Sequence, residues 1–244
     1  MRGLFYVKLR KIKLVTDMGN WINICFVIDE SGSMFGSIDD VVGGFNRVIE
    51  EQKKNKDGKV TVSLYTFSDH DKVNELYRGV DINDIAEFKY NPGGLTALYD
   101  GVGKAIDNIG KWLYEKDQNH EEMPAKTMFV VMTDGGENNS REYKLQDIKD
   151  RIKTQEEVYS WEFVYVGMDL TTKSDANNLG FKNQLYAAKK SINSVMDSFN
   201  FVTSCYRCEA DLSMANSNLS ATLTGMSKAY TEEYEKDRGI KLED

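Results

Sequence analysis

The sequence predicts an α/β protein with a doubly wound, Rossmann-like, mostly parallel sheet and helices on both faces. The first observation is that strand-like apolar runs alternate along the chain with segments whose apolar residues recur at helical spacing. The second is that the runs at 22–28, 127–133 and 161–167 are almost uninterrupted. Such runs are typical of parallel strands that are covered on both faces.

The elements of this sheet follow in order from the apolar pattern. The polar turn at 68–71 makes the run at 72–80 a hairpin partner at the sheet edge. The usual strand order for this fold is 3-2-1-4-5-6, which places the reversal of order between the first and fourth strands. We predict strands at 22–28, 60–67, 72–80, 127–133, 161–167 and 183–187, and helices with apolar faces at 41–49, 98–113 and 145–152.

The chain divides into a basic N-terminal extension at 1–20, the α/β domain at 21–190 and C-terminal helices at 191–244. The extension interleaves five basic residues with apolar ones. We interpret it as an added edge strand or a leader upstream of Met18, and the alternative is a basic arm that contacts a membrane surface or nucleic acid. The C-terminal apolar stripes predict helices that pack on the domain, extend it, swap onto a neighbour or hold a partner.

Composition argues against several functional classes. A net charge of −8 disfavours nucleic-acid binding, and no apolar run approaches the roughly 18 residues of a membrane span. Cys205 and Cys208 have the spacing of a zinc half-site, but no second ligand pair is apparent because His70 and His120 are far apart in the sequence. We therefore expect free thiols and, without a secretory leader, a cytoplasmic protein.

A carboxylate and two hydroxyls follow the first predicted strand at alternate positions, as Asp29, Ser31 and Ser33. Gly32 lets the backbone bend tightly there, so the three side chains can point at one place. Hard oxygen donors of this kind suit a hard divalent cation. Asp134 ends the fourth predicted strand, so the strand order brings its carboxylate to the same crevice as Asp29.

These residues, with Thr96 in the Gly-Gly-Leu-Thr turn at 93–96, carry a resemblance to a known family. The D-x-S-x-S motif, the middle-loop Thr and the later strand-end Asp resemble, in that order, the metal-ion-dependent adhesion site (MIDAS) of von Willebrand factor A (vWA) domains. The resemblance covers roughly residues 20–190 and implies the vWA architecture.

The resemblance implies a role for each motif residue. Ser31, Ser33 and Thr96 would supply side-chain oxygens to the metal, and Asp29 and Asp134 would orient metal-bound water. The expected cofactor is Mg²⁺ or Mn²⁺, because Ca²⁺ prefers more oxygen ligands.

The resemblance also implies a function, that of a protein-binding domain. Neutral hydroxyl ligands leave most of the cation's charge uncompensated, so a vacant position can accept an Asp or Glu of a partner protein. The compact chain with free thiols resembles intracellular bacterial or bacteriophage members. Partners suggested by the family are an AAA+ ATPase of the chelatase or MoxR type, a phage or host complex, or another copy of the chain. The competing interpretation is a scaffold whose metal only stabilises the loops.

The alternative function is an enzymatic one, that of a metal-dependent phosphohydrolase. Asp29 could be an aspartyl-phosphate nucleophile, but such enzymes carry a D-x-D motif and this chain has Ser31 at the second acidic position. A Ser31 nucleophile would need a neighbouring base, and neither histidine belongs to a recognisable triad. No phosphate-binding loop motif is present. We therefore expect no catalysis.

Each residue of the motif also has a purely structural interpretation. Ser31 and Ser33 could cap the helix that follows, and Asp134 could be a turn residue after a strand. The two acids that flank the site, Glu30 and Glu137, are expected to be solvated charges at its rim and not ligands.

Overall fold

The computed structural model describes residues 21–168 and 172–186, and the single positions 196, 197, 199, 200, 203 and 236. In this part of the chain, six strands form one sheet in the order β3-β2-β1-β4-β5-β6. Neighbouring strands are parallel except at the β3 edge, where β2 and β3 are antiparallel. The predicted strand order and edge hairpin are confirmed. The strands are β1 (Trp21–Asp29), β2 (Lys59–Phe67), β3 (Val73–Asp81), β4 (Lys126–Thr133), β5 (Glu162–Gly167) and β6 (Asn183–Tyr186).

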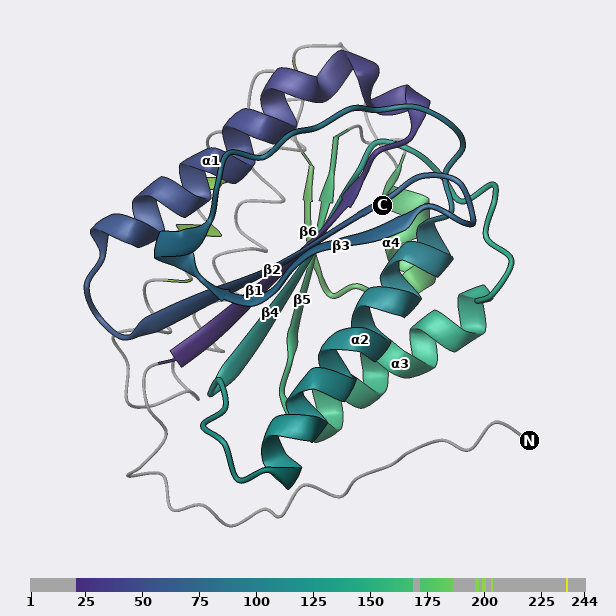
Figure 1. Cartoon of the computed structure of the whole chain (residues 1–244). Helices are drawn as coiled ribbons and strands as arrows, with labels where there is room; N and C mark the ends of the chain where they lie inside the picture. Colours follow the sequence, from purple (N-terminus) through teal and green to yellow (C-terminus); the bar gives the residue numbers. More distant parts are fainter. Residues whose placement is uncertain are drawn as a thin grey trace.

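Helices cover both faces of the sheet, as predicted (Figure 1). One face packs against α1 (Ile38–Lys54), and the other packs against α2 (Leu98–Gln118) and α3 (Leu145–Tyr159). Side chains alternate along a strand, so β1 contributes to both cores. Phe26 lies in the core under α1, and its neighbours Cys25 and Val27 lie in the core under α2 and α3. Burial on both faces explains why β1 reads as one apolar run.

A short 3-10 helix, η2 (Gly32–Ser37), stands between β1 and α1. A 3-10 helix has three residues per turn, so Met34 and Ser37 share one side of it, and both are buried. Ser31 precedes η2 without a side-chain capping bond, and the residue before α1 is Ser37. The interpretation of Ser31 and Ser33 as caps of the long helix is therefore wrong.

Besides η2, two short helices of the described part were not predicted from the sequence. The 3-10 turn η3 (Ile82–Asp84) follows β3, and α4 (Lys173–Leu179) connects β5 to β6. Helix α4 buries only Ala176 and Leu179, so seven residues give too few apolar repeats for a periodic signal. It ends at Gly180, which has a φ of 84° and terminates the helix in the left-handed region.

Several predictions concern residues that the structure does not describe. The N-terminal extension, most of the two C-terminal helices, and Cys205 with Cys208 lie outside the described residues. Met196 and Phe199, from the apolar face of the first predicted C-terminal helix, are described and belong to the core under α1. Within the described ranges, no helix is both long enough and apolar enough to cross a membrane.

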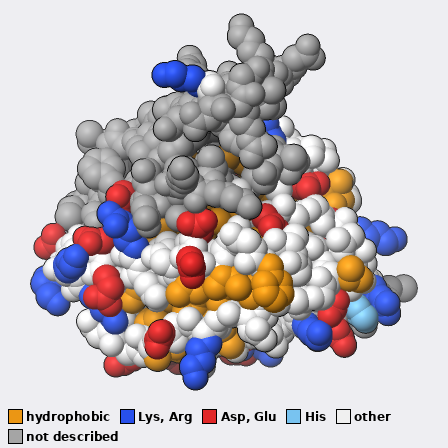
Figure 2. Space-filling model, turned by 90° about the horizontal axis from the view of Figure 1, so that it is seen from above, with side chains coloured by type: hydrophobic (Ala, Val, Ile, Leu, Met, Phe, Trp, Pro, Cys, Tyr) orange, Lys and Arg blue, Asp and Glu red, His pale blue; other side chains and the backbone are white. Residues whose placement is uncertain are grey.

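The described surface mixes charges of both signs with a few exposed apolar groups. Seen from above, acidic and basic side chains lie side by side, and hydrophobic side chains gather in an elongated patch among them (Figure 2). The strongly exposed large hydrophobic residues of the described part are Phe35, Leu76, Leu95, Tyr114 and Val158.

Candidate metal centre

The register of the two central strands fixes the first carboxylate of the site. Ile28 of β1 pairs with Met132 of β4, so Asp29 and Thr133 are neighbours at the carboxyl ends of these strands. Thr133 Oγ1 donates to Asp29 Oδ2 at 2.6 Å, and the Ser31 N–H donates to Asp29 Oδ1 at 2.8 Å. Asp29 is fully buried. Its carboxylate is thus held from both strands.

A chain of hydrogen bonds links the two serines to the second carboxylate. Ser33 Oγ donates to Asp134 Oδ1 at 2.6 Å, and the Ser31 and Ser33 hydroxyl oxygens lie 3.1 Å apart. A serine hydroxyl has a single proton, so the Ser31 hydroxyl is the donor to Ser33. Because the Ser33 proton points at Asp134, lone pairs of its oxygen remain available to a cation.

Thr96 reaches the site from the loop before α2. Its N–H donates to Asn138 Oδ1 at 2.9 Å, and its carbonyl oxygen accepts from the backbone N–H groups of Asn138 and Asn139 at 3.0 and 3.1 Å. The Gly32 N–H donates to the Gly94 carbonyl oxygen at 3.0 Å and joins this loop to the serine loop. Backbone contacts therefore join the Thr96 loop to the other two loops of the site.

Side-chain oxygens from the end of β1, from the loop after it and from the Thr96 loop converge on one small space next to Gly135 of the third loop. A Cβ atom at Gly135 would lie 3.3 Å from Ser33 Oγ, 3.3 Å from Thr96 Oγ1 and 3.8 Å from Asp29 Oδ2. Glycine at this position keeps the space open. Hydroxyl and carboxylate oxygens are the ligands that Mg²⁺ and Mn²⁺ prefer, so the residues present fit such an ion.

The structure brings together all of the residues predicted for the site, Asp29, Ser31, Ser33, Thr96 and Asp134. Their role as metal ligands stays a prediction. Within the described ranges, no group of three or more His, Cys, Asp or Glu residues is placed to hold a metal ion. A cation at this position would therefore depend on the hydroxyl oxygens as well as on the carboxylates.

Burial makes the carboxylate charge of Asp29 unfavourable in the absence of a cation. Loss of solvation raises the pKa of Asp29 to about 6, although the hydrogen bonds from Thr133 and Ser31 oppose this shift. The nearby charge of Asp134 raises the same pKa further. Tyr90 donates its hydroxyl to the Asp29 carbonyl oxygen, and burial together with the charge of Asp29 raises the pKa of that phenol. A divalent ion would offset the repulsion between Asp29 and Asp134.

Sequence reasoning missed the residues that hold the loops in place. Asn138 is the clearest case, because it contacts Thr96 through both its side chain and its backbone. Asp69, in the β2–β3 turn, accepts the Leu95 N–H at 2.9 Å, and a Cβ at Gly94 would lie 2.6 Å from the Asp69 carboxylate. Nothing in the local pattern around Asn138 or Asp69 marks them, since their partners are distant in the sequence.

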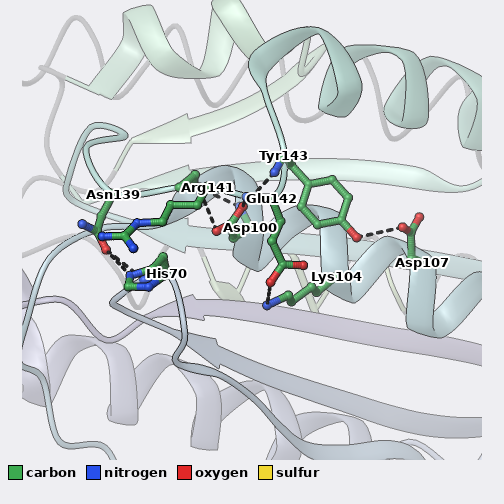
Figure 3. Close-up of polar contacts among 9 residues, drawn as sticks. His70, Asp100, Lys104, Asp107, Asn139, Arg141, Glu142 and Tyr143 are labelled. Atoms are coloured by element: carbon green, nitrogen blue, oxygen red, sulfur yellow. Dashed lines mark hydrogen bonds and ion pairs between the residues drawn. The ribbon is translucent and has the colours of Figure 1, made fainter. Parts of the chain in front are cut away.

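Asp100, at the start of α2, anchors the loop that follows β4 (Figure 3). It is fully buried, and it accepts the backbone N–H groups of Arg141, Glu142 and Tyr143, each at 2.9 Å. The same figure shows His70 against the side chain of Asn139, with the His70 Nδ1 atom 3.2 Å from Asn139 Oδ1. A buried carboxylate with three N–H donors ties the loop firmly to α2.

Glu137 is half-buried and hydrogen-bonded, which differs from the freely solvated rim charge that was predicted, and the prediction that it is not a metal ligand stays a prediction. Its carboxylate accepts the N–H groups of Tyr99, Asn139 and Ser140 and the Ser140 hydroxyl, at 2.6 to 3.0 Å. Glu30 also has a partner, because its Oε1 atom accepts the Asn91 N–H at 3.0 Å. Both acids organise loops at the rim of the site.

The topology, the converging oxygens and the order of the motifs all correspond to one family. The family model for the von Willebrand factor type A domain matches residues 23–206. This chain belongs to the vWA family. The matched segment includes all three loops of the metal centre. A comparison with curated protein sequences finds no match.

Solved vWA structures resemble the chain in fold at low sequence identity. Proximal thread matrix protein 1 from the mussel byssus is 16% identical with a TM-score of 0.55, and the match covers 77% of this chain and 47% of that one. The pilus adhesin SpaC from Lactobacillus rhamnosus GG is 14% identical with a TM-score of 0.55, over 80% and 30% of the two chains. The match thus spans less than half of either neighbour.

A further structure of the mussel protein has a zinc-occupied MIDAS motif. It is 14% identical to this chain with a TM-score of 0.51, and the match covers 78% of this chain and 47% of that one. At these sequence identities, the structural matches establish only that this chain shares the fold of these neighbours.

Proposed function

We propose that this vWA domain binds a divalent cation, Mg²⁺ or Mn²⁺, and through it captures an Asp or Glu side chain of a partner protein. The observation that carries the proposal is the convergence of Ser33 Oγ, Thr96 Oγ1 and Asp29 Oδ2 beside Gly135. Ser31, Ser33 and Thr96 would hold the ion directly, and Asp29 and Asp134 would hold it through water. The zinc-occupied MIDAS of the mussel neighbour supports the choice of site.

The chemistry of the ligands explains why the partner should be acidic. Three neutral hydroxyls leave a divalent ion with most of its positive charge, and the two carboxylates are already engaged by Thr133 and Ser33. A cation in such a site attracts a further carboxylate. If three carboxylates held it directly, its charge would be neutralised and this attraction would be lost.

Metal binding is the first half of the proposal to test. Calorimetric titration of the full chain with Mn²⁺ should show a site that Ser33→Ala weakens, while Thr154→Ala, which removes a hydroxyl on α3, leaves it unchanged. Solvent proton relaxation by bound Mn²⁺ should fall when acetate is added, because a carboxylate then replaces metal-bound water. Equal Mn²⁺ affinity in wild type and Ser33→Ala would refute the assignment of the site.

The scaffold interpretation differs from the proposal in one measurable respect. If the metal only stabilises the loops, Mn²⁺ raises the melting temperature but added carboxylate leaves the relaxation of solvent water unchanged. The proposal does not include catalysis, and His70 contacts Asn139 instead of a hydroxyl of the site. An AAA+ ATPase, a phage or host complex and a second copy of the chain remain predicted partners.

A further inference from the structure

Two strongly exposed apolar side chains lie on the loops that form the metal centre. Phe35 is 65% exposed and lies two residues after Ser33, and Leu95 is 51% exposed and immediately precedes Thr96. The two loops touch where the Gly32 N–H bonds to the Gly94 carbonyl oxygen. Single exposed apolar side chains are common on protein surfaces, but two of them on adjoining loops of one site offer apolar contacts beside it.

The local backbone turns these two side chains outward. In the 3-10 helix η2, Met34 and Ser37 take the buried side, so Phe35 falls on the solvent side. In the second loop, Gly94 has a φ of 88°, and the Leu95 N–H is held by Asp69 at 2.9 Å. Thr96, the next residue, is buried in the site while Leu95 is exposed. The same turns that bring the ligand oxygens inward present an apolar rim outward.

Three acidic residues lie on or against the loops that carry this rim and the metal centre. Glu30 and Glu137 flank the site, and Asp69 lies under Leu95 with its charge paired to Lys72 at 2.8 Å. These carboxylates would repel additional acidic groups of a partner. The bound cation therefore selects one carboxylate, and the residues next to that carboxylate should be uncharged or basic.

We propose that Phe35 and Leu95, together with the metal centre, form a docking surface for a partner segment in which one acidic side chain has apolar neighbours. The inference rests on the proposed function, because the cation receives the acidic side chain. It adds that the apolar contacts with Phe35 and Leu95 determine which acidic segment is chosen. A segment rich in acidic residues would be disfavoured by the surrounding carboxylates.

The test uses a library of short peptides with a fixed central Glu and randomised neighbours, captured by the full chain in saturating Mn²⁺. A library with central Gln measures background. We compare the wild type with a Phe35→Ser/Leu95→Ser variant and with a Leu76→Ser/Val158→Ser control. The control residues are similarly exposed, at 47% and 56%, but lie on β3 and α3.

We expect the wild type and the control to enrich peptides with apolar residues beside the Glu. The rim variant should lose this preference and bind the enriched peptides about tenfold more weakly, a change typical of losing an apolar anchor. Its Mn²⁺ affinity should stay at the wild-type value, because neither side chain contributes a ligand oxygen. Unchanged Mn²⁺ affinity also shows that the variant is folded.

The contrary outcomes separate the two proposals. Metal-dependent capture of Glu peptides without an apolar preference, or with a preference that survives in the rim variant, overturns the docking surface and leaves the proposed function standing. If Glu peptides are captured no better than Gln peptides in Mn²⁺, the proposed function fails and the docking surface fails with it.

Discussion

The two halves of the candidate metal centre are held in place in different ways. The strand half consists of Asp29, which ends the central strand β1, of Ser31 and Ser33 after it, and of Asp134 after the central strand β4. Its position comes from the register of the sheet, and its members bond to each other and to Thr133. The loop half is Thr96, which lies on a loop before α2.

The loop half depends on a few individual hydrogen bonds. The Thr96 backbone is held by Asn138 and Asn139, and the Leu95 N–H is held by Asp69. Thr96 precedes α2 and lies in neither a strand nor a helix. The bonds that a side-chain substitution can remove are those accepted by Asn138 Oδ1 and Asp69 Oδ1. From this difference we expect the strand half to set the charge and metal affinity of the site, and the loop half to respond to a bound ligand.

The largest expected effect is a loss of stability with rising pH, because the ionised Asp29 carboxylate is buried without a cation. The pKa of Asp29 rises from 3.8 to about 6 on folding, so the folded state favours the protonated form. The contribution of protonated Asp29 to the free energy of unfolding is complete below pH 4 and is lost as the pH rises through 6. The free energy of unfolding of metal-free protein should fall by up to about 3 kcal/mol over this interval. Chemical denaturation in chelator measures it.

The control for this pH dependence is Asp29→Asn, which keeps the shape of the side chain but cannot ionise. Its unfolding free energy should lack the decline between pH 4 and 6. A wild-type decline that persists unchanged in Asp29→Asn would assign the effect to other groups. Saturating Mn²⁺ should reverse the wild-type trend, because the ion favours the ionised carboxylate.

The second effect concerns metal affinity. Asp29→Asn should weaken Mn²⁺ binding about 100-fold, the upper end of the range for residues that orient metal ligands or metal-bound water. Calorimetric titration at pH 7 measures the change. The comparison of the two halves predicts that no single substitution around the Thr96 loop weakens metal binding as much, and a larger loss in Asn138→Ala would contradict it.

Asn138→Ala should have an intermediate effect. It removes the acceptor of the Thr96 N–H, so the Thr96 hydroxyl is less firmly positioned, and Mn²⁺ affinity should fall about tenfold. Asn83→Ala, which alters a side chain in the distant η3 turn, is the matched control and should leave the affinity unchanged. Equal affinities in Asn138→Ala and wild type would show that the sheet alone positions Thr96.

The smallest expected effect is a difference between two affinities of Thr96→Ala, which removes the hydroxyl itself and should weaken Mn²⁺ binding at least as much as Asn138→Ala does. If Thr96 contacts the ion mainly when an acidic group is bound, the substitution should weaken capture of Glu-containing peptides more than it weakens Mn²⁺ binding. Asp134→Ala should weaken both to a similar degree. The Mn²⁺ affinity and the Glu-peptide affinity of each variant are measured side by side. Equal losses of the two affinities in Thr96→Ala would show that the loop half does not respond to ligand differently from the strand half.

The sequence by itself determined the sheet and the strand half of the site. Apolar runs such as that of β1 and β4 report burial on both faces, and the order of the strands then places Asp29 and Asp134 at one crevice. Helices α1 to α3 were predicted because each repeats its apolar face over several turns. These signals are local, so neighbouring residues are enough to carry them.

Tertiary structure alone decided how the loops are held. Asn138 and Thr96 are 42 residues apart, and Asp100 lies 41 to 43 residues from the N–H groups that it accepts. Loops have no periodicity, so such pairings leave no pattern in the sequence. The complete burial of Asp29, and with it the raised pKa, likewise depends on segments that fold over the strand ends. Solvation is a property of the packed molecule, and no stretch of sequence encodes it separately.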